Sequence, residues 1–497
     1  MEIYEERTVD IQQLERRLKC KVSLYEQSLT NLGSCTIAMI KAGEQRYLVA
    51  VGSGPIFDEL DGEAEDECKV CPLSHENRLV LNTYLPYTHP VANTTKRPSI
   101  GLGDRLGEAT PGHIWALEGT SVFPIFAQQS IRELNFTDRT FKDVIDAASY
   151  AVFQEGYTYG FGADGDHLKK SEEIKQALED GATMITLDSS EQIDPTIQNL
   201  DEGQLQARYE ALDREIRELY EGLYAEQEFP VGTSTLKLDL PTLKRDILTY
   251  HKALDFIQII YEQHILPSEH PIDFEISIDE TDTPTDPKSH LFIAKELKRR
   301  HVLISTLAPR FVGEFQKGID YIGDTAEFER QLVLHAAIAK QYRYRLSIHS
   351  GSDKFSIFPI LAKTIKGSFH VKTAGTNWLE AVRLVAEKEP SLYRKMHSHA
   401  LKRFGDAKAF YHVTTDIEKI KNLDTMKDED LPSYLNDDNA RQLLHITYGY
   451  LLEDTDETGK KLFKDAFFSL LSREEEHYKQ LLDAHISRHL SLLGFKK

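Results

Sequence analysis

Histidines and carboxylates gather where strand-like runs of the sequence end. The runs LSIHSG and FHVKTAG supply His349, His370 and Lys372; GADGDH supplies Asp164, Asp166 and His167; FEISIDE supplies Glu275 and Asp279. Imidazoles and carboxylates that share one site are the ligands and proton-transferring groups of divalent-metal catalysis. The residue types therefore suggest acid–base chemistry assisted by a metal ion.

Strand alternation indicates which way these side chains point. Successive side chains of a strand face opposite sides, so the apolar residues Leu346 and Ile348 leave His349 on the other face. The same alternation places His370 and Lys372 together, with Val371 opposite them. In FEISIDE, Glu275 and Asp279 share the face opposite Phe274, Ile276 and Ile278.

We expect His167, His349 and His370 to be the metal ligands, with open coordination positions for substrate oxygens. The cations Lys354, Lys372 and Arg310 are candidates to bind a substrate carboxylate or phosphate. Other interpretations stay open. Lys372 has the alternative role of a Schiff-base lysine, and the glycine-containing SGSD and TAGT segments suit a phosphate site. A single histidine at a strand end is more often only a hydrogen-bonded core group.

The elements that must position these residues follow a repeated strand–helix pattern from about residue 121. The predicted strands are VFPIFAQQ, YGFGADGD, ATMITLDSS, IDFEISIDE, HVLISTLAP, YRLSIHSG, SFHVKTAG and KAFYHVTTD. Helical spacing of apolar residues separates most of them, as in EFERQLVLHAAIAKQYR. This α/β pattern predicts a (β/α)8 TIM-type barrel, whose active site lies at the carboxyl ends of the strands.

The remaining sequence suggests three additions to the barrel. Residues 1–118 mix one helix with short strands and form a predicted N-terminal α+β region. The catalytic barrel is expected over 119–430, with a helical insertion at about 191–270. Residues 431–497 read as C-terminal helices that pack on the barrel.

Composition narrows the class of partner. The net charge of -21 over 497 residues argues against nucleic-acid binding, which rewards clustered Lys and Arg. No apolar run reaches the roughly 18 residues of a membrane span, and the charged N-terminus does not resemble a signal peptide. We therefore expect a cytoplasmic protein. Cys68 and Cys71 form a CxxC pair, but a zinc site would need further ligands at matching spacing.

Seven segments together resemble the tagaturonate/fructuronate epimerases of bacterial hexuronate metabolism. They are SIGLGDRLGEATPGHI, GFGADGDHLK, FEISIDET, STLAPRFVGEFQKGIDYIGD, LSIHSGSDKFSIFP, HVKTAGT and ARQLLHITYG, spread from about residue 99 to 450. The resemblance implies a metal-dependent interconversion of D-tagaturonate and D-fructuronate. It also implies that Asp104, Arg105 and His113 line or buttress the pocket, and that Arg441, Gln442 and His445 approach its mouth.

For the site, the resemblance implies His167, His349 and His370 as ligands and Asp166 as the general base. Glu275 is the first choice for the acid and Asp279 the second. The carbon that changes configuration bears no acidic proton, so retro-aldol cleavage and re-addition through a metal-bound enediolate is the expected route. We expect no organic cofactor. Zinc, nickel, cobalt, iron and manganese are not distinguished by three imidazoles.

Two alternatives remain from the sequence. The first is a metal-dependent class II aldolase or sugar isomerase on the same barrel, which would share the enediolate. The second is a non-catalytic sugar-acid-binding protein. In each case the partner is a small sugar acid, and the sequence leaves the oligomeric state unknown.

Overall fold

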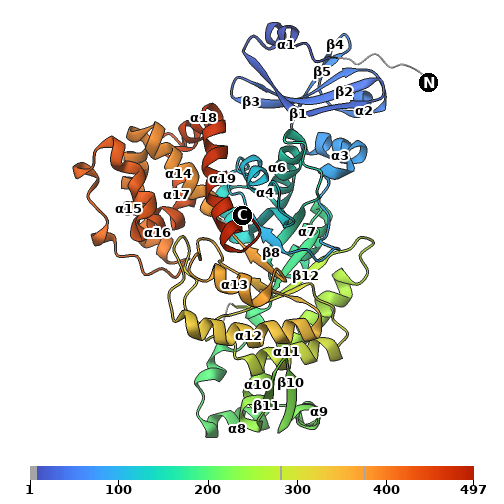
Figure 1. The fold of residues 1–497 in the computed structure, drawn as a ribbon, viewed down its shortest axis with the longest axis vertical. Coiled ribbons are helices and arrows are strands. Elements are labelled where there is room, and N and C mark those ends of the chain that lie inside the picture. The colour runs from blue at the N-terminus through green and yellow to red at the C-terminus, as the bar shows by residue number, and fades with distance from the viewer. Residues whose placement is uncertain (1–7, 280–282, 374, 497) are drawn as a thin grey trace.

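Eight parallel strands close into a barrel at the centre of the molecule, as the strand–helix pattern predicts (Figure 1). The computed structural model describes residues 8–279, 283–373 and 375–496. Around the barrel the strands are β6 (Ser99–Gly101), β7 (Phe123–Ser130), β8 (Gly162–Leu168), β9 (Met184–Asp188), β12 (Asp273–Ile278), β13 (Thr306–Pro309), β14 (Arg345–Ile348) and β15 (Phe369–Lys372), with β15 pairing to β6. Most strands are buried on both faces, as in other parallel barrels.

Helices cover the outside of the barrel. Those that follow the strands in the chain are α4 (Thr110–Leu117), α5 (Ile131–Thr137), α6 (Phe141–Gln154), α7 (Ser171–Asp180), α10 (Leu240–Ile260), α11 (Pro287–Arg299), α12 (Thr325–Tyr342), α13 (Phe358–Ile365) and α14 (Thr376–Lys388). Except for α14, their apolar faces and the strands form the largest hydrophobic core. Burial of this core fixes the strand ends that carry the candidate site.

One predicted strand is wrong, and another was not foreseen. The run KAFYHVTTD forms no strand, because α15 (Pro390–Lys408) ends inside it and the residues that follow make a loop. The eighth barrel strand is instead β6, which comes from SIGLGD and pairs with both β15 and β7. The boundary at residue 118 stays a prediction, but a barrel strand lies before it. Glu280 and Ala374, at the ends of two predicted strands, lie outside the described residues.

The N-terminal region forms a sheet of its own. Its antiparallel strands, in the order β1-β2-β3-β5-β4, are β1 (Val22–Leu32), β2 (Cys35–Ala42), β3 (Gln45–Gly52), β4 (Glu63–Glu65) and β5 (Cys68–Pro72). Helices α1 (Ile11–Leu18), α2 (Pro55–Glu59) and α3 (His75–Tyr84) accompany it. Cys68 and Cys71 are free, buried thiols on β5, and the described residues include no metal-ligand group at them.

Two further additions flank the barrel. The insertion between β9 and β12 contains the helices α8 (Glu202–Glu210) and α9 (Arg214–Tyr224), but also a hairpin of β10 (Gln227–Val231) and β11 (Ser234–Leu238) that the helical prediction missed. The C-terminal helices are α16 (Asp438–Ile446), α17 (Tyr448–Glu453), α18 (Lys464–Arg473) and α19 (Glu475–Leu492). They pack with α14 and α15 around a second core. In the described part of the chain, no helix is long and apolar enough to cross a membrane.

Candidate active site

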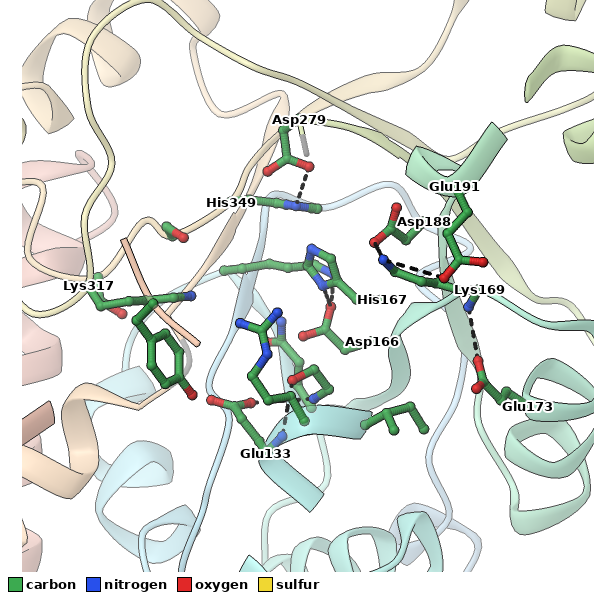
Figure 2. A pocket seen from close by; sticks show the side chains of 18 of the residues that line it. Glu133, Asp166, His167, Lys169, Glu173, Asp188, Glu191, Asp279, Lys317 and His349 are labelled. Atoms are coloured by element: carbon green, nitrogen blue, oxygen red, sulfur yellow. Dashed lines mark hydrogen bonds and ion pairs between the residues drawn. The ribbon is translucent and has the colours of Figure 1, made fainter. Parts of the chain in front are cut away.

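A pocket opens at the carboxyl ends of the barrel strands, where the sequence places its histidines and carboxylates (Figure 2). Its first lobe has a volume of about 330 Å³, and an adjoining second lobe has about 270 Å³. The two lobes share the lining residues Arg132, Asp279, Lys317, His349, Ser350 and Tyr411. Tyr411 belongs to the loop after α15, so the C-terminal part of the chain completes the wall.

His167, Asp279 and His349 form a group that can hold a metal ion. One potential ligand atom from each lies within 4.8 Å of the others. The Nδ1 atom of His349 is 3.1 Å from Asp279 Oδ1, yet it is buried and makes no hydrogen bond. A nitrogen and an oxygen that face each other without an aligned hydrogen bond are suited to share a cation.

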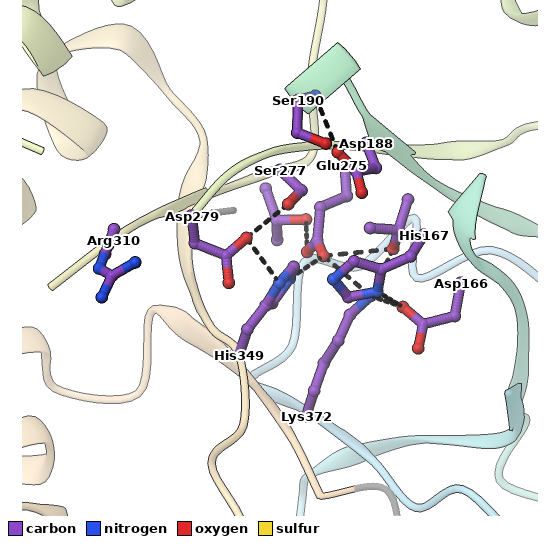
Figure 3. A network of polar contacts seen from close by, with 12 residues as sticks. Asp166, His167, Asp188, Ser190, Glu275, Ser277, Asp279, Arg310, His349 and Lys372 are labelled. Atoms are coloured by element: carbon purple, nitrogen blue, oxygen red, sulfur yellow. Dashed lines mark hydrogen bonds and ion pairs between the residues drawn. The ribbon is translucent and has the colours of Figure 1, made fainter. Parts of the chain in front are cut away.

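Each imidazole of this group is backed by a carboxylate (Figure 3). His349 Nε2 lies 2.7 Å from Glu275 Oε1, and His167 Nδ1 lies 2.7 Å from Asp166 Oδ1. A carboxylate that accepts from one ring nitrogen fixes the tautomer that leaves the other nitrogen free to bind a metal. The donor set therefore fits a divalent cation.

Lys372 lies beneath the metal-binding group and contacts three buried carboxylates. Its Nζ is 2.9 Å from Asp164 Oδ2, 2.6 Å from Asp166 Oδ1 and 3.0 Å from Glu275 Oε1. Burial opposes the ionisation of Asp166, but Lys372 and His167 outweigh it and hold its pKa well below the usual range. Asp166 is therefore ionised, and it lines the first lobe.

The other carboxylates respond to the same surroundings. Burial raises the pKa of Asp164 to about 6 although Lys372 opposes the shift. Burial also opposes ionisation of Glu275, but Lys372 and His349 keep its pKa well below normal. Lys372 provides one permanent positive charge for Asp164, Asp166 and Glu275, and Asp279 faces the two imidazoles of the group, so the charge balance favours an added cation.

His370 is not one of the three residues of the metal-binding group. It pairs with Ser347 and Ser99 within the barrel, deeper than the strand ends, and its Nδ1 is 2.9 Å from Ser99 Oγ. Burial lowers its pKa to about 3, and its Nε2 makes no hydrogen bond within the described structure. The structure brings together two of the three predicted histidine ligands, with Asp279 in the third place, and His370 as a ligand stays a prediction.

The two residues predicted as the acid, Glu275 and Asp279, differ in their access to the pocket. Glu275 is completely buried, behind His349, and accepts hydrogen bonds from Thr186 and Thr306. It does not line either lobe, whereas Asp279 lines both. The structure therefore gives Glu275 the geometry of a support for His349, and its role as the acid stays a prediction.

The predicted substrate cations also differ. Lys354 is fully buried, and its Nζ donates to the carbonyl oxygens of Gln316, Ile319 and Ser352 at 2.8, 2.5 and 2.9 Å. Burial lowers its pKa to about 7. It braces the loop after β14 and does not line either lobe. Arg310 lines the second lobe, and Figure 3 shows it beyond Asp279.

The loop after β14 is held from several sides. Asp353 in this loop forms an ion pair with Arg441 of α16 at 2.7 Å, and its backbone N–H donates to His489 Nε2 of α19 at 3.0 Å. Asp353, His485 and His489 also have ligand atoms close enough for a cation. The Nε2 lone pair of His489 already accepts this hydrogen bond, and the positive charge of Arg441 is adjacent, so both disfavour a bound cation. These contacts therefore hold the loop after β14 in place.

Arg105, from the SIGLGDRLG segment, contacts a residue of the pocket wall, and the pocket roles of Asp104, Arg105 and His113 stay a prediction. Arg105 is buried, donates to Glu133 Oε1 through Nη2 at 2.6 Å and stacks on Tyr448. Gly375 has a φ of 94°, and a Cβ there would lie 2.6 Å from the Arg105 guanidinium. This glycine thus makes room for Arg105 and for a left-handed turn.

Sequence reasoning did not identify several residues of the pocket wall. They are Gln128, Ser130, Arg132, Lys169, Asp188, Glu191, Lys317 and Tyr411. Asp188 and Lys169 follow strand ends, so the barrel rule was a usable signal for them. Arg132 and Tyr411 carried no such signal, because Arg132 looks like an ordinary helix residue and Tyr411 lies in the run expected to be a strand.

The chain matches known proteins over nearly its whole length. Residues 25–493 match the family model UxaE, described as tagaturonate epimerase. A tagaturonate/fructuronate epimerase of Thermotoga maritima is 40% identical over 476 residues, which cover 95% of this chain and 96% of that protein. Crystal structures of the fructuronate-tagaturonate epimerase UxaE from Cohnella laeviribosi, native and with one glycerol bound, share 54% identity and a TM-score of 0.95, covering 97% of this chain and 99% of theirs.

Proposed function

This chain belongs to the tagaturonate epimerase family, an isomerase family, and from that premise we propose that it interconverts D-tagaturonate and D-fructuronate with the help of a divalent metal. The observation that carries the proposal is the group of His167, Asp279 and His349 at the mouth of the barrel. Two imidazoles backed by carboxylates, beside the ionised Asp166, suit metal-assisted proton transfer.

We propose retro-aldol chemistry because the carbon that inverts bears no acidic proton. The bond between this carbon and the carbon next to the ketone breaks, and its electron pair stays on the ketone fragment as an enediolate. The hydroxyl proton moves to a base, which leaves an aldehyde on the fragment that keeps the carboxylate. Rotation of the aldehyde and re-formation of the bond on its other face, with return of a proton to the oxygen, give the epimer.

His167, Asp279 and His349 would hold the metal, which as a Lewis acid would favour negative charge on the ketone and hydroxyl oxygens. Asp166 is our proposed base, since it is ionised and lines the pocket. The group that returns the proton must line the pocket too, which favours Asp279 over Glu275. Asp279 also belongs to the ligand group, and the variant Asp279→Asn separates its role as a ligand from its role as the acid.

Incubation of the purified protein with D-tagaturonate tests the proposal. After chelation we expect no conversion, and we expect D-fructuronate to form once a divalent metal is restored. NMR of the sugar products distinguishes the outcomes. Three-carbon fragments without the epimer would indicate an aldolase, and full turnover by the chelated protein would contradict the metal requirement.

A further inference from the structure

We propose that Arg132 binds the carboxylate of the substrate and so selects sugar acids over neutral sugars; this assignment rests on the proposed function of the pocket. Arg132 lies in the first turn of α5, directly after β7, and lines both lobes. It thus shares a cavity with Asp166, His167 and His349.

The backbone that carries Arg132 is firmly held. The neighbouring Glu133 forms a capping box with Ser130 at the start of α5. The buried Arg105 holds the same Glu133 side chain through Nε at 2.9 Å and Nη2 at 2.6 Å. Because Arg105 neutralises Glu133, this adjacent carboxylate does not occupy the Arg132 guanidinium.

The guanidinium of Arg132 is oriented by the C-terminal loop. Its Nη1 donates to the Phe410 carbonyl oxygen at 3.2 Å, and its Cζ lies 5.4 Å from the centre of the Tyr411 ring. Among the described residues, no carboxylate oxygen forms an ion pair with it within 4.0 Å. A guanidinium has five N–H donors, so this orientation leaves donors for a bidentate contact with a carboxylate.

Two other cations of the first lobe already have carboxylate partners. Lys372 contacts Asp164, Asp166 and Glu275. Lys169 lies 3.4 Å from Asp188 and 4.0 Å from Glu191. Lys317 shares the wall with Arg132, and Figure 2 shows its side chain extending into the pocket.

The proposed reaction requires a group that holds the substrate carboxylate. Retro-aldol cleavage leaves the carboxylate on the aldehyde fragment, which must rotate without leaving the pocket. A planar guanidinium that grips two carboxylate oxygens holds one end of the fragment while its aldehyde end turns. A neutral ketohexose lacks this handle, so Arg132 would act as a specificity-determining residue.

Steady-state kinetics with D-tagaturonate and with D-tagatose, its neutral counterpart, test the assignment. We expect Arg132→Gln to lower kcat/KM for D-tagaturonate by about 10²–10³-fold, through loss of charge-assisted hydrogen bonds, and to leave any activity on D-tagatose unchanged. Arg132→Lys should recover part of the loss. Lys142→Gln is the control, because it removes one exposed positive charge from α6 that lines neither lobe, and it should change kcat/KM by less than about threefold.

A binding measurement separates this inference from the proposed function. Glycerate resembles the aldehyde fragment with an alcohol in place of the aldehyde, and glycerol is its neutral counterpart. By calorimetry, the metal-loaded protein should bind glycerate more tightly than glycerol, and Arg132→Gln should abolish most of that preference. A wild-type protein without epimerase activity would contradict the proposed function. The calorimetry would still show whether Arg132 binds a carboxylate. An unchanged preference for glycerate in Arg132→Gln, or no preference in the wild type, would overturn the assignment.

Discussion

Side chains at the barrel mouth have strongly shifted pKa values, because neighbouring charges act on them inside a buried site. Burial opposes the imidazolium form of His349, yet Asp279 and Glu275 together raise its pKa to about 10. A cation bound at Nδ1 would replace that proton and satisfy the same carboxylates. His167 also adopts a left-handed backbone conformation, with φ 56°, which is uncommon for a residue with a side chain. Such strain at this position is consistent with a constrained site.

Replacing Asp279 tests its role as a ligand. We expect Asp279→Asn to weaken metal binding by at least about tenfold, because the amide carries no charge to offset the cation, and excess metal should partly restore turnover. Chelator competition measures the affinity. Glu191→Gln, which changes another carboxylate of the same lobe, should retain its metal. Full metal content with lost turnover in Asp279→Asn would instead identify Asp279 as the acid.

A buried carboxyl far from the pocket should make stability depend on pH. Burial raises the pKa of Asp246 on α10 to about 7, and only one of its oxygens is hydrogen-bonded, to Ser289. The folded state holds this proton more tightly than the unfolded chain, whose pKa is about 3.9. Stability from this group is therefore present at low pH and is lost as pH rises from about 4 to 7.

Asp246→Asn should remove this dependence, since the amide stays neutral. We expect the variant to be more stable than the wild type at pH 8, by an amount that linkage limits to about 4 kcal/mol, with a much smaller difference at pH 5. Urea unfolding at both pH values measures it. Asp424→Asn, at an exposed position, should leave stability nearly unchanged. Equal effects of Asp246→Asn at the two pH values would refute the argument.

At the scale of elements, α5 depends on a segment more than 25 residues earlier in the chain. Arg105 follows β6 and reaches the Glu133 carboxylate inside the protein, where each group is almost fully buried. The pair therefore couples the β6–α4 loop to the first turn of α5. This contact positions both Glu133 and the neighbouring Arg132 at the pocket.

Breaking this pair from one side should be costly. Arg105→Leu leaves Glu133 buried without its cation, so we expect a loss of about 3–5 kcal/mol in the free energy of unfolding. The double variant Arg105→Leu/Glu133→Leu removes both charges and should recover most of that loss. Denaturant titration of the wild type, Arg105→Leu, Glu133→Leu and the double variant measures the coupling. Additive losses in the double variant would show that the pair contributes no specific interaction.

At the scale of the whole molecule, polar contacts join the N-terminal sheet to the C-terminal helices, and several of them converge on one carboxylate. Glu475, at the start of α19, accepts hydrogen bonds from Lys41 Nζ at 2.9 Å and from Tyr25 Oη at 3.0 Å, and Arg46 Nη2 lies 3.7 Å away. In Figure 1 the sheet lies at one end of the molecule, next to α6, and α18 and α19 approach it from the side of the C-terminal helices. The termini of the chain thus stabilise each other.

Neutralising Glu475 should loosen this junction. We expect Glu475→Gln to lower the free energy of unfolding by about 1–3 kcal/mol, because two cations lose a largely buried partner. The exposed neighbour offers a control, and Glu476→Gln should change stability by less than about 0.5 kcal/mol. Thermal unfolding compares them. Equal midpoints for the two variants would mean that the Glu475 charge does not stabilise this junction.

The sequence by itself determined the barrel and the strand-end positions of His167, His349 and Asp166. Period-two alternation within buried strands decides which side chains face the barrel interior, and parallel strands bring their carboxyl ends to one rim. It could not separate a short strand from a loop. β6 spans only Ser99–Gly101 and forms a strand because β15 and β7 pair with it. The run at 408–416 has strand-like residues, but no barrel strand is left for it to join.

Only the tertiary structure decided which candidates can meet. His349 and His370 look equivalent in sequence, since each ends an apolar run, yet the register of β14 and β15 places His370 deeper in the barrel. Lys354, Lys372 and Arg132 are all cations, and only their burial and their neighbours distinguish their roles. Lys354 holds a loop, Lys372 forms buried ion pairs, and Arg132 lines the pocket. Distances between residues far apart in the chain depend on register, loop path and packing, which local side-chain patterns do not encode.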